Sequence, residues 1–576
     1  YLTANFSRVM RYIAAINIQT AIIVLGIYFA KNVKEIKKID IKNVLQFLFL
    51  LILAVIVYAV WRWDSGFYTT LNWDFYHHQV VSRLITEGKF DFITSNVSDS
   101  FQFIGYSTIF HTMFAFPQVL LTPDLLKYWW FLEFIHLFTT ILASYVIAKV
   151  ITKNEWIGVL SAIIGAFVFE STVAYTSLFL MPQNIAAVLV TIFIAQELRE
   201  VLEEKSTFKR VITFDFLVFL IYILMNHAIL GVLGVVLVFF SKIFKEFHKL
   251  KMGENIINTL LVTSFLLLII IPYFASLVDL NFINRGEAEF FNFTLSEKYG
   301  FMRTIYGFSL LAFLPLGYYF SLAKKSLNYK LLIILINGIL ALVIASIPYS
   351  LKFYTILRFF VHTGMALGIW LIIRDFGRVT KLVSTFLIFI TMLVVLTINI
   401  DTYKQVPSYK EISTHVTANE LEAAKFLEQV YTNRKVILIS DPGTMHILEG
   451  LSGVNTPGGA YTSLETRKVL TDIYYSRNKE ITQKLFTIND GVITDPPQSI
   501  LFAVGGRFSK WQLAPDERRL GIFWNVWKPH DLSIRDKEAY DFIFYLDEIL
   551  EYQEVFKNDG VVIFEIPIRT IFPENT

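Results

Sequence analysis

Apolar runs of membrane-spanning length dominate the chain up to about residue 400. An α-helix needs about 20 predominantly apolar residues to cross the hydrocarbon core of a bilayer. Runs of this kind are found at 9–30, 44–61, 127–149, 156–173, 182–199, 256–278, 304–323, 331–347, 356–373 and 380–400. A further stretch, 212–243, is too long for one ordinary span and is interrupted at Asn226-His227. We expect it to enter the membrane and return, which predicts an α-helical polytopic bundle of about twelve membrane segments.

Basic residues between the runs predict the orientation of this bundle, because lysine and arginine are enriched in cytoplasmic loops. Their clusters lie at 31–42, 149–153, 205–210, 242–251, 324–330 and 374–381. All of these clusters face one side only if 212–243 forms two short segments. The external parts of the chain are then 62–126, 174–181, the turn at Asn226, 279–303, 348–355 and everything after 400. The pattern predicts a multi-pass protein of the cell membrane.

The pattern changes after about residue 400. Short hydrophobic runs at 436–440, 500–504, 542–546 and 561–566 alternate with a helical pattern at 418–430 and with turn signals such as Asp441-Pro442-Gly443. Short apolar runs bounded by glycine and proline are typical of strands in a water-soluble domain. We therefore predict a transmembrane module at 1–400 and an extracytoplasmic α/β domain at 401–576.

The composition agrees with a membrane protein and excludes several kinds of site. Of the 576 residues 55% are hydrophobic and 17% charged, against about 25% charged in soluble domains. The net charge of +3 gives no field that would attract nucleic acid. Cysteine is absent, which excludes thiolate catalysis, disulfides and cysteine-ligated zinc. The sequence contains no Walker-type or strand-linked dinucleotide glycine motif, so we expect no bound nucleotide.

The first external segment carries an ionisable cluster, Asp74-Phe75-Tyr76-His77-His78, at the edge of the bundle. Such groups are expensive to desolvate and are candidates for function by default. On a helix, Asp74, His77 and His78 share a face, where a carboxylate can accept a proton as a general base. The alternative is a capping role for the carboxylate at the start of an interfacial helix.

Further candidates lie at the predicted external ends of other segments. Glu170 is a second acid that either lines a cavity, ligates a metal beside Asp74, or pairs with a nearby hydroxyl at the helix end. His227 stands at the break in 212–243, where a polar turn inside the membrane needs protein or water around it. Arg358 either binds a phosphate or reaches lipid headgroups. The remaining substrate-binding candidates are Tyr106, His111, Gln183 and Arg303. For His111 a structural role, and for Gln183 a capping role, are the alternatives.

The motifs of the first external segment resemble those of the GT-C superfamily of integral-membrane glycosyltransferases, especially archaeal and bacterial members. Asp74-Phe-Tyr-His77 and Tyr106-Ser-Thr-Ile-Phe-His111 are similar to that group's Asp-x-Tyr-His and Tyr-Pro-x-x-x-His patterns, with Ser107 in place of the proline. The resemblance implies transfer of a hexose or pentose from a polyprenyl-phosphate donor to a glycan, lipid or protein acceptor, with inversion, at the external face.

The resemblance also implies roles for the candidate residues. Asp74 is the base that deprotonates the acceptor hydroxyl, and His77 and Glu170 belong to the same catalytic group. Arg358, together with His227, holds the departing phosphate. Asp74 and Glu170 are candidate ligands for a divalent ion, Mg²⁺ or Mn²⁺, although relatives that use no metal leave this open.

Three other functions stay open at the level of the sequence. A transporter or flippase for a lipid-linked sugar would carry no chemistry, but such proteins tend to show paired repeats, which we do not find. An assembly protein would leave Asp74, Glu170 and His227 without a role. An oligosaccharyltransferase-like enzyme is the third: the Trp-Trp-Asp-Tyr-Gly signature of that subfamily is absent, and 294–297 is faintly similar to its lid-loop motif.

Overall fold

The computed structural model describes about half of the chain. The described segments are 41–62, 74–87, 96–98, 101–102, 110–111, 114–115, 118, 126–167, 180–202, 227–249, 253–277, 313–323, 326–345, 350–374, 377, most of 379–394, 416–431, 434–440, 442–456, 499–505 and 552–567. The chain divides into two compact units. Unit 1 comprises Tyr1–Lys37, Ser65–Trp130 and Val406–Thr576, and unit 2 comprises Lys38–Asp64 and Phe131–Gln405.

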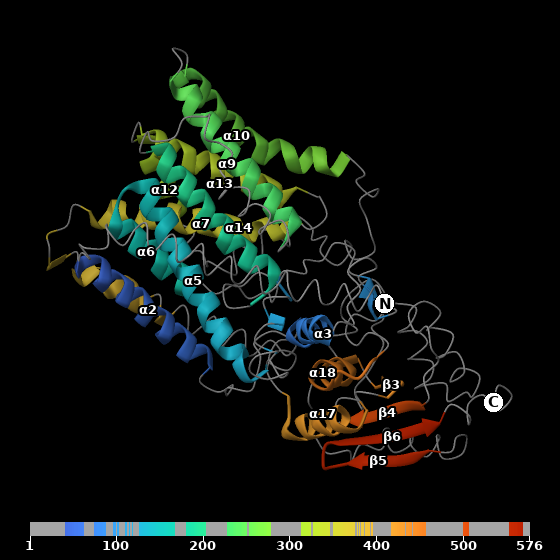
Figure 1. Cartoon of the computed structure of the whole chain (residues 1–576). Helices are drawn as coiled ribbons and strands as arrows, with labels where there is room; N and C mark the ends of the chain where they lie inside the picture. The colour runs from blue at the N-terminus through green and yellow to red at the C-terminus, as the bar shows by residue number, and fades with distance from the viewer. Residues whose placement is uncertain are drawn as a thin grey trace, which may run out of the picture. The chain divides into compact units, whose positions relative to one another are not determined.

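Unit 2 is helical throughout its described part (Figure 1). Its helices are α2 (Ile41–Arg62), α5 (Leu126–Thr152, whose first turn belongs to unit 1), α6 (Glu155–Phe167), α7 (Pro182–Leu202), α9 (Ala228–Lys249), α10 (Gly253–Leu277), α12 (Phe313–Ala323), α13 (Leu327–Ile344) and α14 (Tyr354–Ile373), with the short 3₁₀ turn η5 (Ser350–Phe353) before α14. Four of the described helices are long and apolar enough to cross a membrane: α2, α5, α13 and α14.

The predicted spans agree with these helices where both can be compared. The runs at 44–61, 127–149, 182–199, 331–347 and 356–373 coincide with α2, α5, α7, α13 and α14. Helix α9 starts at Ala228, directly after the predicted break at His227. The run at 9–30 and the first half of 212–243 lie outside the described residues, and 380–400 is described only in part. The total of twelve segments therefore stays a prediction.

Helix α14 is the core of unit 2, whereas α2 is at its periphery. Of the membrane-length window of α14, 83% is buried within the protein, against 28% for α2. Helix α14 packs against α6, α7, α12 and α13. Its close contact with α12 depends on glycines: an added Cβ on Gly317 would overlap the carbonyl oxygen of Gly364, and one on Gly368 would overlap that of Phe313. Small residues let helices approach closely where lipid offers no hydrophobic driving force.

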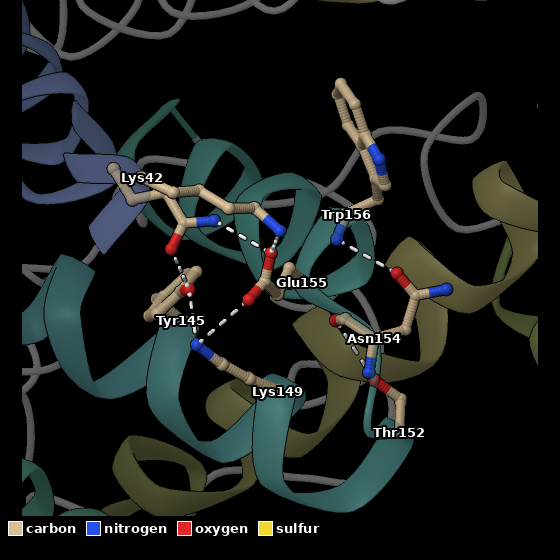
Figure 2. Close-up of polar contacts among 8 residues, drawn as sticks. Lys42, Tyr145, Lys149, Thr152, Asn154, Glu155 and Trp156 are labelled. Atoms are coloured by element: carbon tan, nitrogen blue, oxygen red, sulfur yellow. Dashed lines mark hydrogen bonds and ion pairs between the residues drawn. The ribbon is translucent and has the colours of Figure 1, made fainter. Parts of the chain in front are cut away.

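A polar network joins the ends of α2, α5 and α6 at one end of unit 2 (Figure 2). The carboxylate of Glu155 accepts from Lys42 Nζ at 2.5 Å and Gln46 Nε2 at 3.1 Å, and it lies 3.5 Å from Lys149 Nζ. Lys149 in turn donates to the hydroxyl of Tyr145 at 3.2 Å. Two of the residues in this network, Lys42 and Lys149, belong to the basic clusters that the sequence predicts to lie on the cytoplasmic side.

The C-terminal part of unit 1 contains a four-stranded mixed sheet in the order β3-β4-β6-β5. Strands β3 (Val436–Ile439) and β4 (Ser499–Gly505) are parallel, while β6 (Val561–Pro567) is antiparallel to both β4 and β5 (Gln553–Lys557). Helix α17 (Ala418–Tyr431) packs on β5 and β6, and α18 (Pro442–Ser452) packs on β3 and β4. Three of the predicted strands are confirmed, and 542–546 lies outside the described residues. The location of this segment outside the membrane stays a prediction.

Helix α17 begins where its sequence signals a start. The backbone N–H of Glu420 donates to Oγ1 of Thr417 at 3.1 Å, and the backbone N–H of Thr417 donates to the Glu420 carboxylate at 2.9 Å. This reciprocal pair is a capping box, in which a threonine and a glutamate three residues later satisfy the first free N–H groups of a helix.

Candidate functional site

The predicted catalytic segment folds as a helix, α3 (Asp74–Glu87), in unit 1. Asp74 is its first residue, and His77 lies on the same helix three residues later. The side chains of Asp74 and His77 lie outside the described part of the structure, so the roles predicted for them stay predictions.

Aromatic rings enclose the start of α3. Phe75 is fully buried, and its ring packs edge to face on Trp129 with centroids 4.6 Å apart. The ring of Phe114 packs against Trp129, with centroids 5.2 Å apart, and against Phe110, with centroids 4.6 Å apart. Such contacts add to the hydrophobic stabilisation of the rings and fix their geometry. The backbone that carries Asp74 is therefore anchored directly after its first residue.

Two predicted site histidines meet in this unit. Nδ1 of His78 and Nε2 of His111 lie 3.0 Å apart, and both rings are buried. Burial lowers the pKa of His78 well below its ordinary value, and the neighbouring His111 and His446 lower it further. Both effects disfavour the cation, so His78 is neutral at pH 7 and one imidazole donates to the other. Ser82 adds a hydrogen bond to the carbonyl oxygen of His111 at 3.1 Å.

Unit 2 contains a second polar group, centred on Arg358 of α14. Its side chain is 0% exposed, with the guanidinium over the ring of Phe359 at 4.9 Å. The charge of Arg358 acts on the imidazoles of His136 on α5 and His362 on α14. A guanidinium buried in this way does not reach lipid headgroups, which removes the alternative of a headgroup anchor.

Helix α6 leaves room for this polar group at Gly165. An added Cβ there would lie 2.6 Å from Oγ of Ser144 and 3.2 Å from Nδ1 of His362. Nε2 of His136 and Oγ of Ser144 are buried and have no hydrogen-bond partner among the described residues. Buried polar atoms normally find partners, so their presence beside a permanent cation indicates a site that receives a polar ligand.

Sequence reasoning missed a buried ion pair between α2 and α5. Arg62 Nη2 pairs with the carboxylate of Glu133, which is 0% exposed, and Arg62 Nε donates to the hydroxyl of Tyr58 at 3.0 Å. Tyr58 also donates to Glu133 at 3.3 Å. The signal was available, because Glu133 is the only acidic residue in the apolar run 127–149 and needs a partner there.

Gln183 and Asn184 are buried at the start of α7, and the ring of His227 stands directly before α9. Nδ1 of His227 accepts the backbone N–H of Leu230 at 3.4 Å, so this imidazole caps the helix. The charge of Lys352, in η5, also acts on the ring of His227. A capping role and a role in ligand binding are compatible, because the second ring nitrogen stays available for another contact.

The remaining predicted residues, Tyr106, Glu170 and Arg303, lie outside the described part of the structure. The metal-binding role predicted for Asp74 and Glu170 therefore stays a prediction. Among the described residues, no group of three or more histidine, aspartate or glutamate side chains is arranged to hold a metal ion.

Comparison with known proteins gives matches at the level of structure. Neither models of protein families nor the sequences of curated proteins match this chain. The archaeal oligosaccharyltransferase AglB from Archaeoglobus fulgidus, in complex with an inhibitory peptide and a dolichol-phosphate, matches with a TM-score of 0.51 and 10% sequence identity, over 90% of this chain and 74% of that chain. The apo form of the A. fulgidus oligosaccharyltransferase matches over the same shares with a TM-score of 0.52 and 10% identity.

ArnT from Cupriavidus metallidurans bound to undecaprenyl phosphate gives a TM-score of 0.49 with 11% identity, over 91% of this chain and 98% of that chain, which is too low to support an argument. At 10% identity, the two oligosaccharyltransferase matches establish the fold alone. They agree with the apolar helices of unit 2 and with the resemblance found in the sequence. The chain is therefore a multi-pass membrane protein whose fold is similar to that of the A. fulgidus oligosaccharyltransferase.

Proposed function

We propose that this protein transfers a sugar from a polyprenyl-phosphate donor to an acceptor hydroxyl or amide at the external face of the cell membrane, with inversion at the anomeric carbon. The observation that carries the proposal is the polar group around Arg358. The charge of a buried guanidinium acts there on the imidazole of His136, and neither Nε2 of His136 nor Oγ of Ser144 has a hydrogen-bond partner among the described residues. Arginine matches the geometry of a phosphate, and each charge-assisted hydrogen bond contributes about 1.5–3 kcal/mol.

The proposed reaction assigns separate roles to the two polar groups. The acceptor oxygen or nitrogen attacks the anomeric carbon, and its proton passes to the carboxylate of Asp74. The bond between the anomeric carbon and the phosphate oxygen breaks, and the lipid phosphate leaves with the bonding electron pair. Negative charge therefore grows on the phosphate in the transition state, where the fixed cation of Arg358 lowers the barrier. His77 and Glu170 assist Asp74, while the residues that bind substrate are His78, Tyr106, His111, Gln183, His227 and Arg303.

The fold supports a lipid-linked donor. The A. fulgidus enzyme with this fold was solved with a dolichol-phosphate, which is a polyprenyl phosphate. A donor of this class also explains why the sequence has no nucleotide motif. Asp74 and Glu170 remain candidate ligands for Mg²⁺ or Mn²⁺, and no step above depends on a metal.

The topology that goes with this function has about twelve membrane segments and the residues after 400 on the external side. The alternating directions of α2, α5, α6 and α7 support it. Lys42 and Lys149 lie at the end shown in Figure 2, whereas Arg62 is the last residue of α2 and Glu133 lies in the first half of α5.

An oligosaccharyltransferase-like reaction is the second candidate. The match to an oligosaccharyltransferase solved with an inhibitory peptide favours it, because that protein binds a peptide as well as a lipid phosphate. The two candidates share the donor chemistry and differ in the acceptor, which is an asparagine-containing peptide in one case and a glycan or lipid hydroxyl in the other.

The test is a transfer assay in liposomes with polyprenyl-phosphate hexose and pentose donors and with peptide, glycan and lipid acceptors. Asp74→Asn keeps the size of the side chain and removes the base, so we expect turnover to fall by at least about a hundredfold while donor binding persists. A folded Asp74→Asn protein with normal turnover would exclude Asp74 as the base. Movement of the donor across the membrane without a transferred product would instead identify a flippase.

A further inference from the structure

Helix α3 is held in unit 1 by the C-terminal segment of the chain as well as by its own loop. Among its described side chains, those from Phe75 to Arg83 are buried, including polar ones such as Gln79 and Ser82. Helix α18, more than 350 positions later in the sequence, packs directly on α3. The helix that starts at Asp74 therefore takes its position from a part of the chain that the sequence alone does not connect with it.

At the centre of their contact, helices α3 and α18 lie so close together that there is no room for a side chain at position 450. An added Cβ on Gly450 of α18 would lie 2.5 Å from Cβ of Tyr76 and 2.8 Å from its Cα. Cβ atoms do not approach their neighbours at such distances, so any larger residue at Gly450 would push the helices apart. The ring of Tyr76 packs next to this contact on His446 of α18, with centroids 5.7 Å apart. Tyr76 is only two residues from Asp74, so a displacement here is transmitted to the start of α3.

Arg83 makes a second connection, one turn before the end of α3. Its Nη2 donates to the carbonyl oxygen of Leu451 at 3.0 Å, and the same atom lies 3.8 Å from the carboxylate of Glu428 on α17. Leu451 is in the last turn of α18, where carbonyl groups lack partners within the helix and a cation is favourable. The Arg83 side chain is buried, and a buried hydrogen bond to a charged group contributes about 1.5–3 kcal/mol.

The end of α18 is shaped to receive this guanidinium. Gly453 has a φ of 77°, a left-handed conformation that ends the helix and is costly for residues with a Cβ. Its N–H donates to the carbonyl oxygen of Glu449 at 2.8 Å. An added Cβ on Gly453 would also overlap Nη1 of Arg83. One glycine thus provides both the turn and the space for the arginine.

We propose that helix α18 positions the catalytic helix α3, with Arg83 and Gly450 as positioning residues that set the place of Asp74. The inference rests on the proposed function of Asp74 as a base, and it adds a task for the C-terminal segment. Neither Arg83 nor Gly450 touches substrate. They act through the backbone of α3, and a misplacement of a catalytic group by about 1 Å is enough to lower a rate by about a hundredfold.

The first measurement is hydrogen exchange of the α3 amides in the full-length protein, for the parent, Gly450→Ala and Arg83→Ala. We expect faster exchange in 74–87 for both variants, because local opening becomes easier when a packing partner is lost. Gly338→Ala is the matched control: it is also a helix glycine, but an added Cβ there meets nothing within 4 Å. Arg83→Lys keeps a charged donor and is expected to restore most of the protection, which keeps the test valid if Gly450→Ala does not fold.

The second measurement is the rate of sugar transfer by the same variants. Loss of positioning lowers kcat by about ten- to a hundredfold and leaves the KM for the donor unchanged, because Arg358 is untouched. Unchanged exchange in α3, or faster exchange with an unchanged kcat, would overturn the proposal. A parent protein that transfers no sugar with any donor would overturn the proposed function itself, a result separate from the exchange data on α3.

Discussion

At the scale of single residues, substitutions of Arg358 can distinguish a cation that binds a ligand from a cation with a purely structural role. We expect Arg358→Ala to lower donor affinity or transfer rate by about ten- to a hundredfold, the loss of one charge-assisted contact to phosphate. Arg358→Lys keeps the positive charge but loses the planar, two-pronged geometry of the guanidinium, so its donor affinity or transfer rate should lie between those of the parent and Arg358→Ala. The measurement is transfer from a polyprenyl-phosphate sugar in liposomes, together with thermal unfolding.

Arg374 supplies the matched control, since it follows the last residue of α14 and its guanidinium lies over the ring of Phe320 at 5.4 Å. Arg374→Ala removes the same side chain from the other end of the same helix and should leave transfer unchanged. If Arg358→Ala transfers sugar as fast as the parent, the phosphate is held elsewhere, with Arg303 and His227 as the next candidates.

Glu449 in α18 gives unit 1 a pH-dependent stability. Burial raises the pKa of its carboxyl to about 8, although hydrogen bonds from Thr456 lower it in part. An unfolded glutamate titrates near 4.3, so between about pH 4.3 and 8 the folded state holds a proton that the unfolded state has lost. The contribution of this carboxyl group to the free energy of unfolding is therefore fully present below about pH 4.3 and decreases as the pH rises to about 8.

We therefore expect Glu449→Gln, which cannot ionise, to unfold at a higher temperature than the parent at pH 8.5. A shift of at least about 2–4 °C corresponds to about 1 kcal/mol in a unit of this size. At pH 5 the two proteins should unfold at similar temperatures. A difference that is the same at both pH values would show that the carboxyl is not protonated in the folded protein.

Sequence reasoning groups candidate residues most readily where they lie within one segment of the chain. Asp74, His78 and His111 all belong to the first external segment, and His78 and His111 meet in the structure. The partnership of Glu133 with Arg62 was missed, because it joins two helices whose relative rotation is set by packing and not by their own sequences. The roles predicted for Asp74 and Glu170 depend on side chains that the described part does not contain.

At the scale of elements, the contact between α12 and α14 carries the clearest sequence signature. Gly364 and Gly368 are four residues apart on α14, the spacing that puts two small residues on one helix face. We expect Gly368→Ala and Gly317→Ala to lower the unfolding temperature and the yield of folded protein in detergent, because each added methyl overlaps a carbonyl oxygen of the other helix. Gly338→Ala in α13 should be neutral or slightly stabilising, as alanine has the higher helix propensity. Equal behaviour of all three variants would mean that α12 and α14 can separate without cost.

Hydrophobic periodicity predicted helices better than it predicted their environment. Runs of 18 or more apolar residues leave few alternatives to a membrane helix, which is why α2, α5, α13 and α14 were found close to their observed bounds. Helix α3 is different: its sequence is rich in polar residues and indicates an exposed helix, yet Gln79, Ser82 and Arg83 are buried. Their burial depends on partners in α18 and in the loop around His111, which local patterning does not encode.

At the scale of the whole molecule, the two compact units are not continuous in sequence, because each combines segments that are far apart along the chain. A boundary near residue 400 follows from composition, but Ser65–Trp130 forms one unit with Val406–Thr576. This pairing depends on contacts such as Arg83 with Leu451, whose separation in sequence is 368 positions. A composition shift can show where a membrane bundle ends, and it carries no information on which loop the following segment will bind.

The orientation of the chain is the last prediction, and the absence of cysteine makes it simple to test. Lys557 of β5 has a side chain that is 57% exposed, and Gly377 is exposed just after α14 with nothing within 4 Å of an added Cβ. A single Lys557→Cys should react with a membrane-impermeant maleimide in intact cells, because the segment after 400 is predicted to be external. Gly377→Cys lies between Arg374 and Arg378, in a basic loop expected to face the cytoplasm, so it should react only after permeabilisation. Labelling of Gly377→Cys but not of Lys557→Cys in intact cells would invert the whole topology, and the transfer reaction would then have to take place on the cytoplasmic face.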